Sequence, residues 1–324
     1  TKIWKRSSSR KHENTGDGFA LSLKAGCQLV DMEMVQFHPT GMVLPEEIAG
    51  TLVTEAVRGE GGILLNIKGE RFMNTYDKKR MELSSRDRVT KANYLEITEG
   101  RGTANGGVFL DISHKDKDYI IEKIPKIYRQ FLDSQMLDIS KKPMEVAPTA
   151  HYSMGGIYVT PEDHWTGING LYAAGEVSGG LHGANRLGGN SLTEILVFGK
   201  RAGKAAAQYS KELSQHIRCQ VTIQAAKETI NRHIHKGTQP AISLQYELSN
   251  IMWECCGVVR EGKKLKEGLN KVRDLKSQIN NVDVRIDVDN NDDLVQIFNL
   301  EASLLSAEAT ILSAIERQES RGSH

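Results

Sequence analysis

The segment 170–203, GLYAAGEVSGGLHGANRLGGNSLTEILVFGKRAG, constrains the fold more than any other part of this sequence. Its apolar start, 171–174, predicts a buried strand, its glycine-rich part, 175–190, a loop, and 191–213 a helix. Ser191 and Glu194 have the spacing of a capping box at the start of that helix. The free N–H groups and the positive end of the dipole at a helix start favour an anion, so this segment predicts an α/β fold with a cofactor or anion site.

Two charged residues inside the glycine-rich loop support a ligand site. Glu176 is well placed to accept a hydrogen bond from a ribose hydroxyl. Arg186 lies among glycines without an adjacent carboxylate, and burying such a cation is costly unless a ligand anion pairs with it. The alternative is a glycine-rich turn before an ordinary helix, which leaves Arg186 without an explanation.

Length and composition exclude several other classes of protein. At about 150 residues per domain, 324 residues predict about two domains. Lys and Arg number 42 against 41 Asp and Glu, so bulk charge does not predict nucleic-acid binding. We expect no membrane span, because no apolar run approaches the ~20 residues required. The four cysteines lack the spacing of zinc or iron–sulfur ligands, so we expect no metal in this chain.

The remaining elements follow from periodicity and turn residues. Thr15 or Asp17 is expected to cap a first helix, and a strand over 28–37 is expected to end in a His38-Pro39-Thr40-Gly41 turn. We predict helices over 16–26, 48–58, 84–98 and most of 116–137, a hairpin over 63–73, a strand over 108–111, and a helical bundle from helices at 220–236, 241–256, 258–280 and 293–319. The acidic stretch 283–293 is interpreted as a solvated loop, since Asp292 and Phe298 stand where a calcium loop needs Gly and Glu.

Four further segments hold polar residues in apolar or glycine-rich surroundings: His38, the run 54–62, Ser85-Arg86-Asp87, and His151. Each has an alternative without function. His38 can be a core histidine, Glu55 and Arg58 a surface i,i+3 ion pair, and Arg86 with Asp87 a charge pair at a helix start.

Taken together, five motifs carry a resemblance to a known family. DMEMVQFHPTG, TEAVRGEGG, ELSSRD, APTAHYSMGG and GLYAAGEVSGGLHGANRLGGNSL stand in the order found in the flavoprotein subunits of succinate dehydrogenases and fumarate reductases, with L-aspartate oxidase as a relative. The likeness extends over nearly the whole chain. It implies an α/β FAD-binding domain, here partial, with an inserted α+β capping domain and a C-terminal helical bundle.

The resemblance also implies the roles of individual residues. The substrate is a C4 dicarboxylate, with Arg186 and His151 on one carboxylate and His38 and Thr54 on the other. Hydride passes at the flavin N5, and Arg86 gives the proton, recharged through Glu55 and Arg58. The family's FAD contacts correspond to these positions: Gly175, Glu176, Asn190, Ser191 and Leu192.

Domain limits, partners and alternatives follow from the same resemblance. We expect 1–31 and 150–209 to belong to the FAD-binding domain, 32–149 to the substrate cap and 210–324 to the helical domain, with family residues missing at both ends. Electrons would pass to or from an iron–sulfur subunit, in the cytoplasm or peripherally on the cytoplasmic face of a membrane through partner subunits. The alternatives are L-aspartate oxidase, a thiol-dependent fumarate reductase flavoprotein, and a catalytically silent remnant that acts as a binding module.

Overall fold

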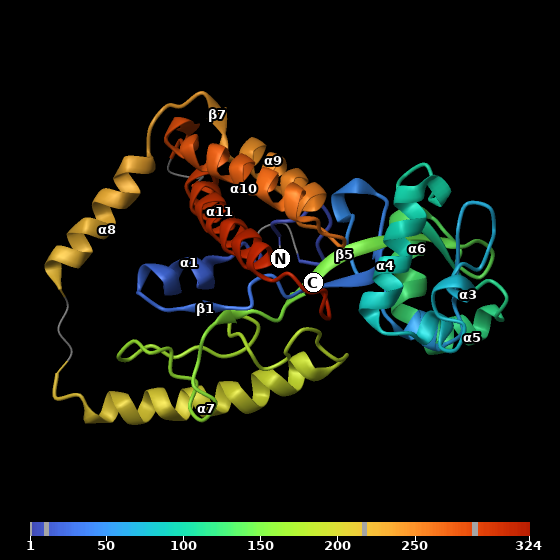
Figure 1. The fold of residues 1–324 in the computed structure, drawn as a ribbon, viewed down its shortest axis with the longest axis horizontal. Helices are drawn as coiled ribbons and strands as arrows, with labels where there is room; N and C mark the ends of the chain where they lie inside the picture. The colour runs from blue at the N-terminus through green and yellow to red at the C-terminus, as the bar shows by residue number, and fades with distance from the viewer. Residues whose placement is uncertain (1, 10–12, 216–218, 287–290) are drawn as a thin grey trace.

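The computed structural model describes residues 2–9, 13–215, 219–286 and 291–324 of the chain (Figure 1). Its centre is a 4-stranded antiparallel sheet in the order β2 (Val35–Met42), β5 (Met144–Ser153), β4 (Val108–Asp111), β3 (Ile63–Leu65). Helix α4 (Arg86–Glu96) lies against β2. Two hydrophobic cores adjoin this sheet. The buried residues of the first core all lie between Met42 and Val146 in the sequence.

Helices form the second core, at the upper left of Figure 1. Helices α9 (Ala241–Cys255), α10 (Gly262–Ser277) and α11 (Asp292–Glu316) pack on one another and on Trp4 and Phe37. The apolar side of α10 is buried at Leu265, Leu269, Val272 and Leu275. Helix α8 (Gln220–His233), whose residues are all described, buries none of them, and its His233 contacts Phe298 of α11.

The other elements are two short strand pairs and the remaining helices and turns. Strand β1 (Leu29–Val30) pairs with β6 (Gly156–Ile157), and β7 (Gln239–Pro240) pairs with β8 (Val282–Asp283). The remaining helices are α1 (Asp17–Lys24), α2 (Ala56–Gly59), α3 (Met73–Tyr76), α5 (Lys117–Lys123), α6 (Pro125–Gln135) and α7 (Asn190–Glu212), with 3-10 turns at Glu46–Ile48, Met81–Leu83 and Ile279–Asn281 and a π turn at Ile97–Arg101. Most predicted helices and the strand at 108–111 are therefore confirmed.

Irregular pairing between β2 and β5 shapes the centre of the sheet. Gln36 faces Tyr152 while Phe37 faces Ala150, so His151 is an extra residue on β5. A second shift lies between His38 and Gly41. Bulges of this kind re-aim side chains and tolerate proline, which lacks the N–H of the ladder.

The predicted turn at 38–41 is wrong for that reason. Pro39 and Gly41 lie within β2, because the second bulge takes Pro39 out of the regular pairing. The helix predicted over 48–58 is also wrong except at α2. Gly50 N donates to Met42 O and Val53 N to Thr40 O, so this backbone pairs with β2 instead of coiling.

Three other local expectations are corrected. The hairpin over 63–73 does not form, because β3 pairs with β4 and the turn at Gly69 leads into α3. At 171–174 only Tyr172 makes a bridge, to Trp165. The cap of α1 is Gly16, at φ 100°, and no side chain bonds to that helix start; a Cβ there would meet Ser306 Oγ at 2.0 Å.

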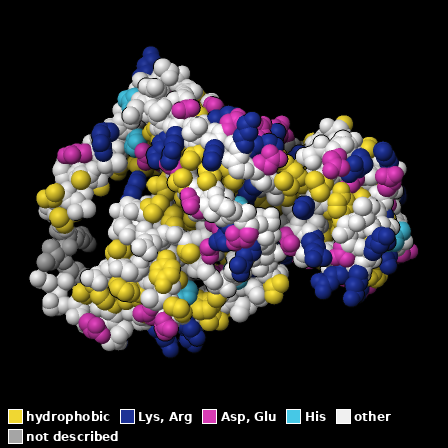
Figure 2. All heavy atoms as spheres, in the orientation of Figure 1, with side chains coloured by type: hydrophobic (Ala, Val, Ile, Leu, Met, Phe, Trp, Pro, Cys, Tyr) yellow, Lys and Arg dark blue, Asp and Glu magenta, His cyan; other side chains and the backbone are white. Residues whose placement is uncertain are grey.

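Helix α7 lies along the lower edge of the molecule in Figure 1, and Figure 2 shows hydrophobic side chains gathered over it. Leu192, Ile195 and Leu196 are exposed there, while Glu194 and Ala202 are its buried residues. In the described ranges, no helix combines the length and apolar character needed to cross a lipid bilayer. Residues 287–290, part of the predicted acidic loop, lie outside the described chain.

Candidate active site

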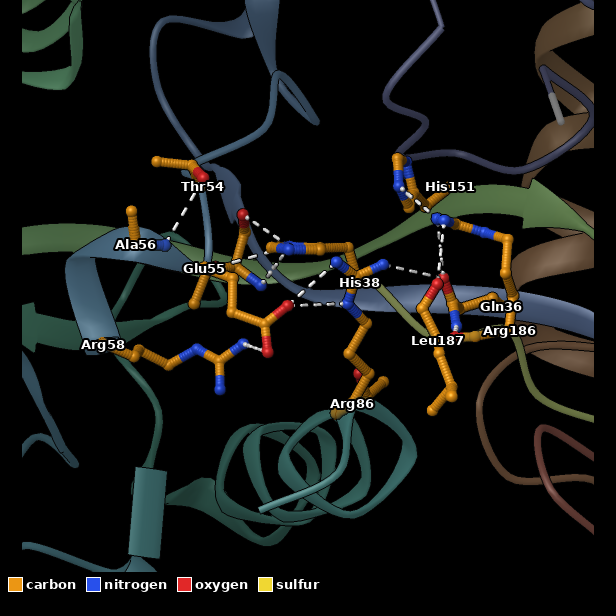
Figure 3. A network of polar contacts seen from close by, with 12 residues as sticks. Gln36, His38, Thr54, Glu55, Ala56, Arg58, Arg86, His151, Arg186 and Leu187 are labelled. Carbon is orange, nitrogen blue, oxygen red and sulfur yellow. Dashed lines mark hydrogen bonds and ion pairs between the residues drawn. The ribbon is translucent and has the colours of Figure 1, made fainter. Parts of the chain in front are cut away.

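Gln36 on β2 joins two arginines that are far apart in the sequence (Figure 3). Its Oε1 accepts a hydrogen bond from Arg86 at 3.0 Å and another from Arg186 at 3.2 Å. Its Nε2 donates to the carbonyl oxygen of Arg186 at 2.7 Å. One neutral amide thus holds two cations together, and such a gathering of positive charge favours an anionic ligand.

Glu55 lies on the other side of Arg86. One carboxylate oxygen accepts from Arg86 Nε at 3.0 Å and from a terminal nitrogen at 2.8 Å. The other oxygen lies 3.7 Å from Arg58, whose side chain is fully buried. The i,i+3 pair of Glu55 and Arg58 is therefore present, but only Glu55, at 44% exposure, lies at the surface. Arg58, Glu55 and Arg86 form one ionic chain.

Two histidines complete the group. The rings of His38 and His151 meet edge to face with centroids 5.6 Å apart. Burial, with the neighbouring His151 and arginines, lowers the pKa of His38 well below its usual value. Burial and the charges of Arg186 and Arg86 lower the pKa of His151 to about 4, so both rings are neutral at pH 7.

The protonation of His151 follows from its neighbours. Its Nε2 lies 3.2 Å from a terminal nitrogen of Arg186, and an arginine only donates. The neutral ring therefore carries its proton on Nδ1 and donates to Ser8 Oγ at 3.0 Å. The extra residue in β5 explains why consecutive residues His151 and Tyr152 both contact Arg186, whose guanidinium lies 4.3 Å from the Tyr152 ring.

Thr54 is exposed at the rim of this group. Its hydroxyl accepts from Ala56 N at 3.4 Å, next to Glu55 in Figure 3. The structure thus brings together six of the predicted catalytic and substrate residues, His38, Glu55, Arg58, Arg86, His151 and Arg186. Thr54 lies next to Glu55 in the chain and makes no hydrogen bond to His38.

The predicted cofactor residues lie in the glycine-rich loop and at the start of α7. Glu176 is largely buried, accepts from Ser153 N at 3.0 Å and lines a cavity of about 380 Å³ with residues 14–19. Burial raises the pKa of the Glu176 carboxyl. Gly175 precedes it at φ 86°. Asn190, Ser191 and Leu192 begin α7, where no side chain caps the helix.

The capping box predicted for Ser191 and Glu194 is wrong. No side chain caps α7, and the Glu194 carboxylate instead binds Tyr152 and His182. Sequence reasoning also missed Gln36, Ser8 and Tyr152. Gln36 carried a usable signal, since it is a polar residue in an apolar strand on the same segment as His38. Nothing local marks Ser8.

Comparison with known proteins shows the family of this chain. A family model described as an FAD binding domain matches residues 3–192, and one described as the fumarate reductase flavoprotein C-terminus matches 245–324. The chain is 48% identical over 98% of its length to a CoM/CoB fumarate reductase subunit from Methanothermobacter marburgensis, covering 57% of that protein. It is 40% identical over 99% of its length to the 8-methylmenaquinol:fumarate reductase flavoprotein subunit of Wolinella succinogenes, covering 53% of it.

Solved structures show the same likeness. Quinol fumarate reductase from E. coli superposes with a TM-score of 0.91 at 34% identity, over 100% of this chain and 57% of that one. These matches define an FAD-binding flavoprotein, and the predicted fold class is confirmed. Within that class, the chain belongs to the succinate dehydrogenase and fumarate reductase flavoprotein family. It spans about half the length of these relatives.

The residues present fit part of an FAD. A carboxylate beside a cavity, at Glu176, suits the hydroxyl groups of the cofactor, and an uncapped helix start at Asn190 suits an anionic ring edge. Across the described residues, no group of three or more His, Cys, Asp or Glu is placed to hold a metal ion. Cys27, Cys255 and Cys256 are buried free thiols, and Cys219 is exposed.

Proposed function

We propose that this chain carries the dicarboxylate site of an FAD-dependent enzyme that interconverts succinate and fumarate. The observation that carries the proposal is the double hydrogen bond of Gln36 Oε1, which brings Arg86 and Arg186 to one place beside two histidines. A diacid needs positive or donating groups for both ends, and these residues supply them within one small region.

The binding roles divide between the two histidines. Arg186 offers a planar fork to one carboxylate, with His151 beside it. The buried ring of His38 and the hydroxyl of Thr54 serve the other carboxylate. For His151 to donate to that carboxylate, its ring must take the Nε2–H form, so substrate replaces the present contact between His151 and Arg186. Holding both ends fixes the central carbons for reaction.

Arg86 is the proton donor. Its guanidinium is held by Glu55 through two nitrogens and by Gln36 through the third, which fixes its direction. Glu55 restores the proton after each turnover, and Arg58 holds the second oxygen of that carboxylate. An arginine is a weak acid, with a pKa above about 12, and this role depends on such fixed geometry next to the carbanion-like centre.

FAD, when bound, takes or gives the hydride at the substrate carbon. Within this chain, Gly175 and Glu176 would hold its hydroxyl region, and Asn190, Ser191 and Leu192 its ring edge. We also propose that 1–31 and 150–209 serve cofactor binding, that 32–149 closes over the substrate, and that 210–324 supports both.

The electron partner has two candidates. An iron–sulfur subunit is the partner we propose, and a quinone-linked relative is 40% identical to this chain. The 48% identity with a CoM/CoB fumarate reductase favours a second candidate, in which thiols supply the electrons through another subunit. Fumarate reduction by the complete protein with its partners, driven in turn by thiols and by a reduced quinone, separates the two.

The test of the central proposal uses Arg86→Ala in the complete protein. Turnover of succinate and fumarate should fall by about 10⁴-fold or more, while malonate still binds, because the proton donor is lost and Arg186 remains. Arg88→Ala is the matched control: it lies on the same helix, with a side chain that is 67% exposed, and should keep normal rates. Wild-type turnover in Arg86→Ala would overturn the proton-donor role. Aspartate oxidation by oxygen without succinate turnover would instead indicate an L-aspartate oxidase. A protein that binds neither flavin nor a diacid would indicate a binding module.

A further inference from the structure

Glu194 is a buried acid that the proposed reaction does not use. Its side chain is 1% exposed, on the first turns of α7. It does not cap that helix. One oxygen, Oε2, takes both the hydroxyl of Tyr152 and Nε2 of His182, the latter at 2.9 Å. Burying a carboxylate is costly unless it is hydrogen-bonded, and here both donors go to the same atom.

Tyr152 connects this acid to the substrate arginine. Its hydroxyl end binds Glu194, and its ring face supports the Arg186 guanidinium at 4.3 Å. The ring of His182 packs edge to face against Tyr152 with centroids 5.6 Å apart. The tyrosine is thus fixed at its hydroxyl and along its edge, and one of its faces is left for the arginine.

We propose that Glu194 is a positioning residue that acts through Tyr152 to hold Arg186 in the orientation that receives a substrate carboxylate. The inference rests on the proposed dicarboxylate site for its consequence, but the geometry it describes exists in the free protein. Two effects work together. The hydrogen bond fixes the plane of the ring, and donation to an anion makes the ring more electron-rich, which strengthens its attraction for a cation.

The surroundings of Arg186 explain why such a support is needed. Arg186 Nε is buried without a hydrogen-bond partner, and Arg86 contributes a second positive charge through the shared Gln36. Burial and the charge of Arg86 lower the pKa of Arg186, while Tyr152, Glu176 and Glu194 oppose that shift. A negative charge behind the ring offsets the repulsion without occupying the face of Arg186 that substrate needs.

The chain offers a matched control in its other core. Tyr76 donates to Glu96 Oε1 at 2.8 Å, and Glu96 is buried, so this is the same phenol–carboxylate pair away from Arg186. Tyr76→Phe should lower the melting temperature without changing ligand binding. Glu194→Gln keeps an acceptor for the tyrosine and removes the charge, and Tyr152→Phe keeps the ring and removes the bond.

The first readout is the Arg186 Nε–H signal of the complete, ligand-free protein by ¹⁵N NMR, assigned from its loss in Arg186→Lys. It should shift or broaden in Glu194→Gln and Tyr152→Phe and stay unchanged in Tyr76→Phe. An unchanged signal in both active-site variants overturns the inference, whether or not the protein binds a diacid.

The second readout is the dissociation constant of malonate. Glu194→Gln should raise it about fivefold, the scale of a weakened cation–π contact, with kcat within about twofold. The effect should be smaller in an Arg186→Lys background, because a flexible ammonium lacks the planar group that the Tyr152 ring orients. Equal effects of Glu194→Gln in both backgrounds overturn the inference. A wild-type protein that binds no malonate overturns the proposed function, and the NMR result alone then tests the role of Glu194.

Discussion

At the scale of single residues, the active site depends on an amide that carries no charge. Gln36 accepts from two arginines with the same oxygen and donates to the backbone of one of them. A neutral acceptor links the cations without cancelling them. The site therefore keeps positive charge available for a dianionic ligand.

Replacing Gln36 with Glu should separate stability from binding. The new carboxylate would pair with Arg86 and Arg186, which stabilises the free protein. Its second oxygen would replace the Nε2 donor and face the Arg186 carbonyl oxygen, which costs about 1–3 kcal/mol, so the free energy of unfolding should change by less than about 1 kcal/mol. The new carboxylate would also compete with the substrate, so malonate should bind at least about tenfold more weakly. Thermal unfolding and calorimetric titration measure the two effects. Tighter malonate binding by Gln36→Glu would contradict this account of the amide.

The neutral histidines predict an acid limb of stability. The folded-state pKa of His151 is about 4, below the ordinary value of 6.5, so the unfolded chain binds more protons between these values. Stability is then complete above about pH 6.5 and falls as the pH drops toward 4, by at most about 3 kcal/mol from this residue. The pKa of His38 is lowered in the same direction, so His38 contributes to the same fall in stability. Urea unfolding from pH 7 to 4 should show a shallower fall in His151→Gln, and an identical slope would count against buried neutral His151.

Residue-level prediction from sequence singled out polar groups in apolar or glycine-rich surroundings, and the roles predicted for them stay predictions. His38, Arg86 and Arg186 are brought together as the family resemblance implies. Gln36 and Tyr152 were missed because their contacts come from segments far away in the chain, which no local pattern records. Ser191 and Glu194 had capping-box spacing, but a buried phenol and a histidine compete successfully for that carboxylate.

At the scale of elements, the bulged pair β2–β5 is the feature that sequence periodicity could not predict. Proline and glycine at 39 and 41 favour a turn locally, yet long-range pairing with β5 carries the strand through them. A helix was predicted over 84–98, and α4 forms there with Arg86 as its first residue. Two side chains of α4 bind β2 where its backbone lacks partners: Thr90 donates to Phe37 O at 2.9 Å and Asn93 to Pro39 O at 2.8 Å.

Thr90→Val should therefore lower both stability and turnover. It leaves a buried carbonyl without its donor, which costs about 1–3 kcal/mol, and it loosens the helix that carries Arg86. Thr98→Val is the control, because Thr98 donates to Tyr94 O at an exposed position and its loss should change stability by less than about 0.5 kcal/mol. Chemical denaturation and steady-state rates measure both. Equal destabilisation by the two variants would show that the hydrogen bond from α4 to β2 contributes no more to stability than an exposed one.

At the scale of the whole molecule, the site lies where separate parts of the chain meet. Ser8 comes from the N-terminal segment, His38 and His151 from the central strands, Arg86 from α4, and Arg186 from the glycine-rich loop. Sequence motifs predicted the fold class and the family, which the comparisons confirm. They could not predict how α7 and α8 lie, because neither helix buries a continuous apolar face in the described chain.

A crystal structure of the complete protein with bound malonate tests most directly whether these arginines and histidines bind both ends of one short diacid. The account predicts one carboxylate within hydrogen-bond distance of Arg186 and His151, the other beside His38 and Thr54, and Arg86 facing the carbons between them. Malonate bound elsewhere, or held by one of the two groups with its second carboxylate in solvent, would contradict it.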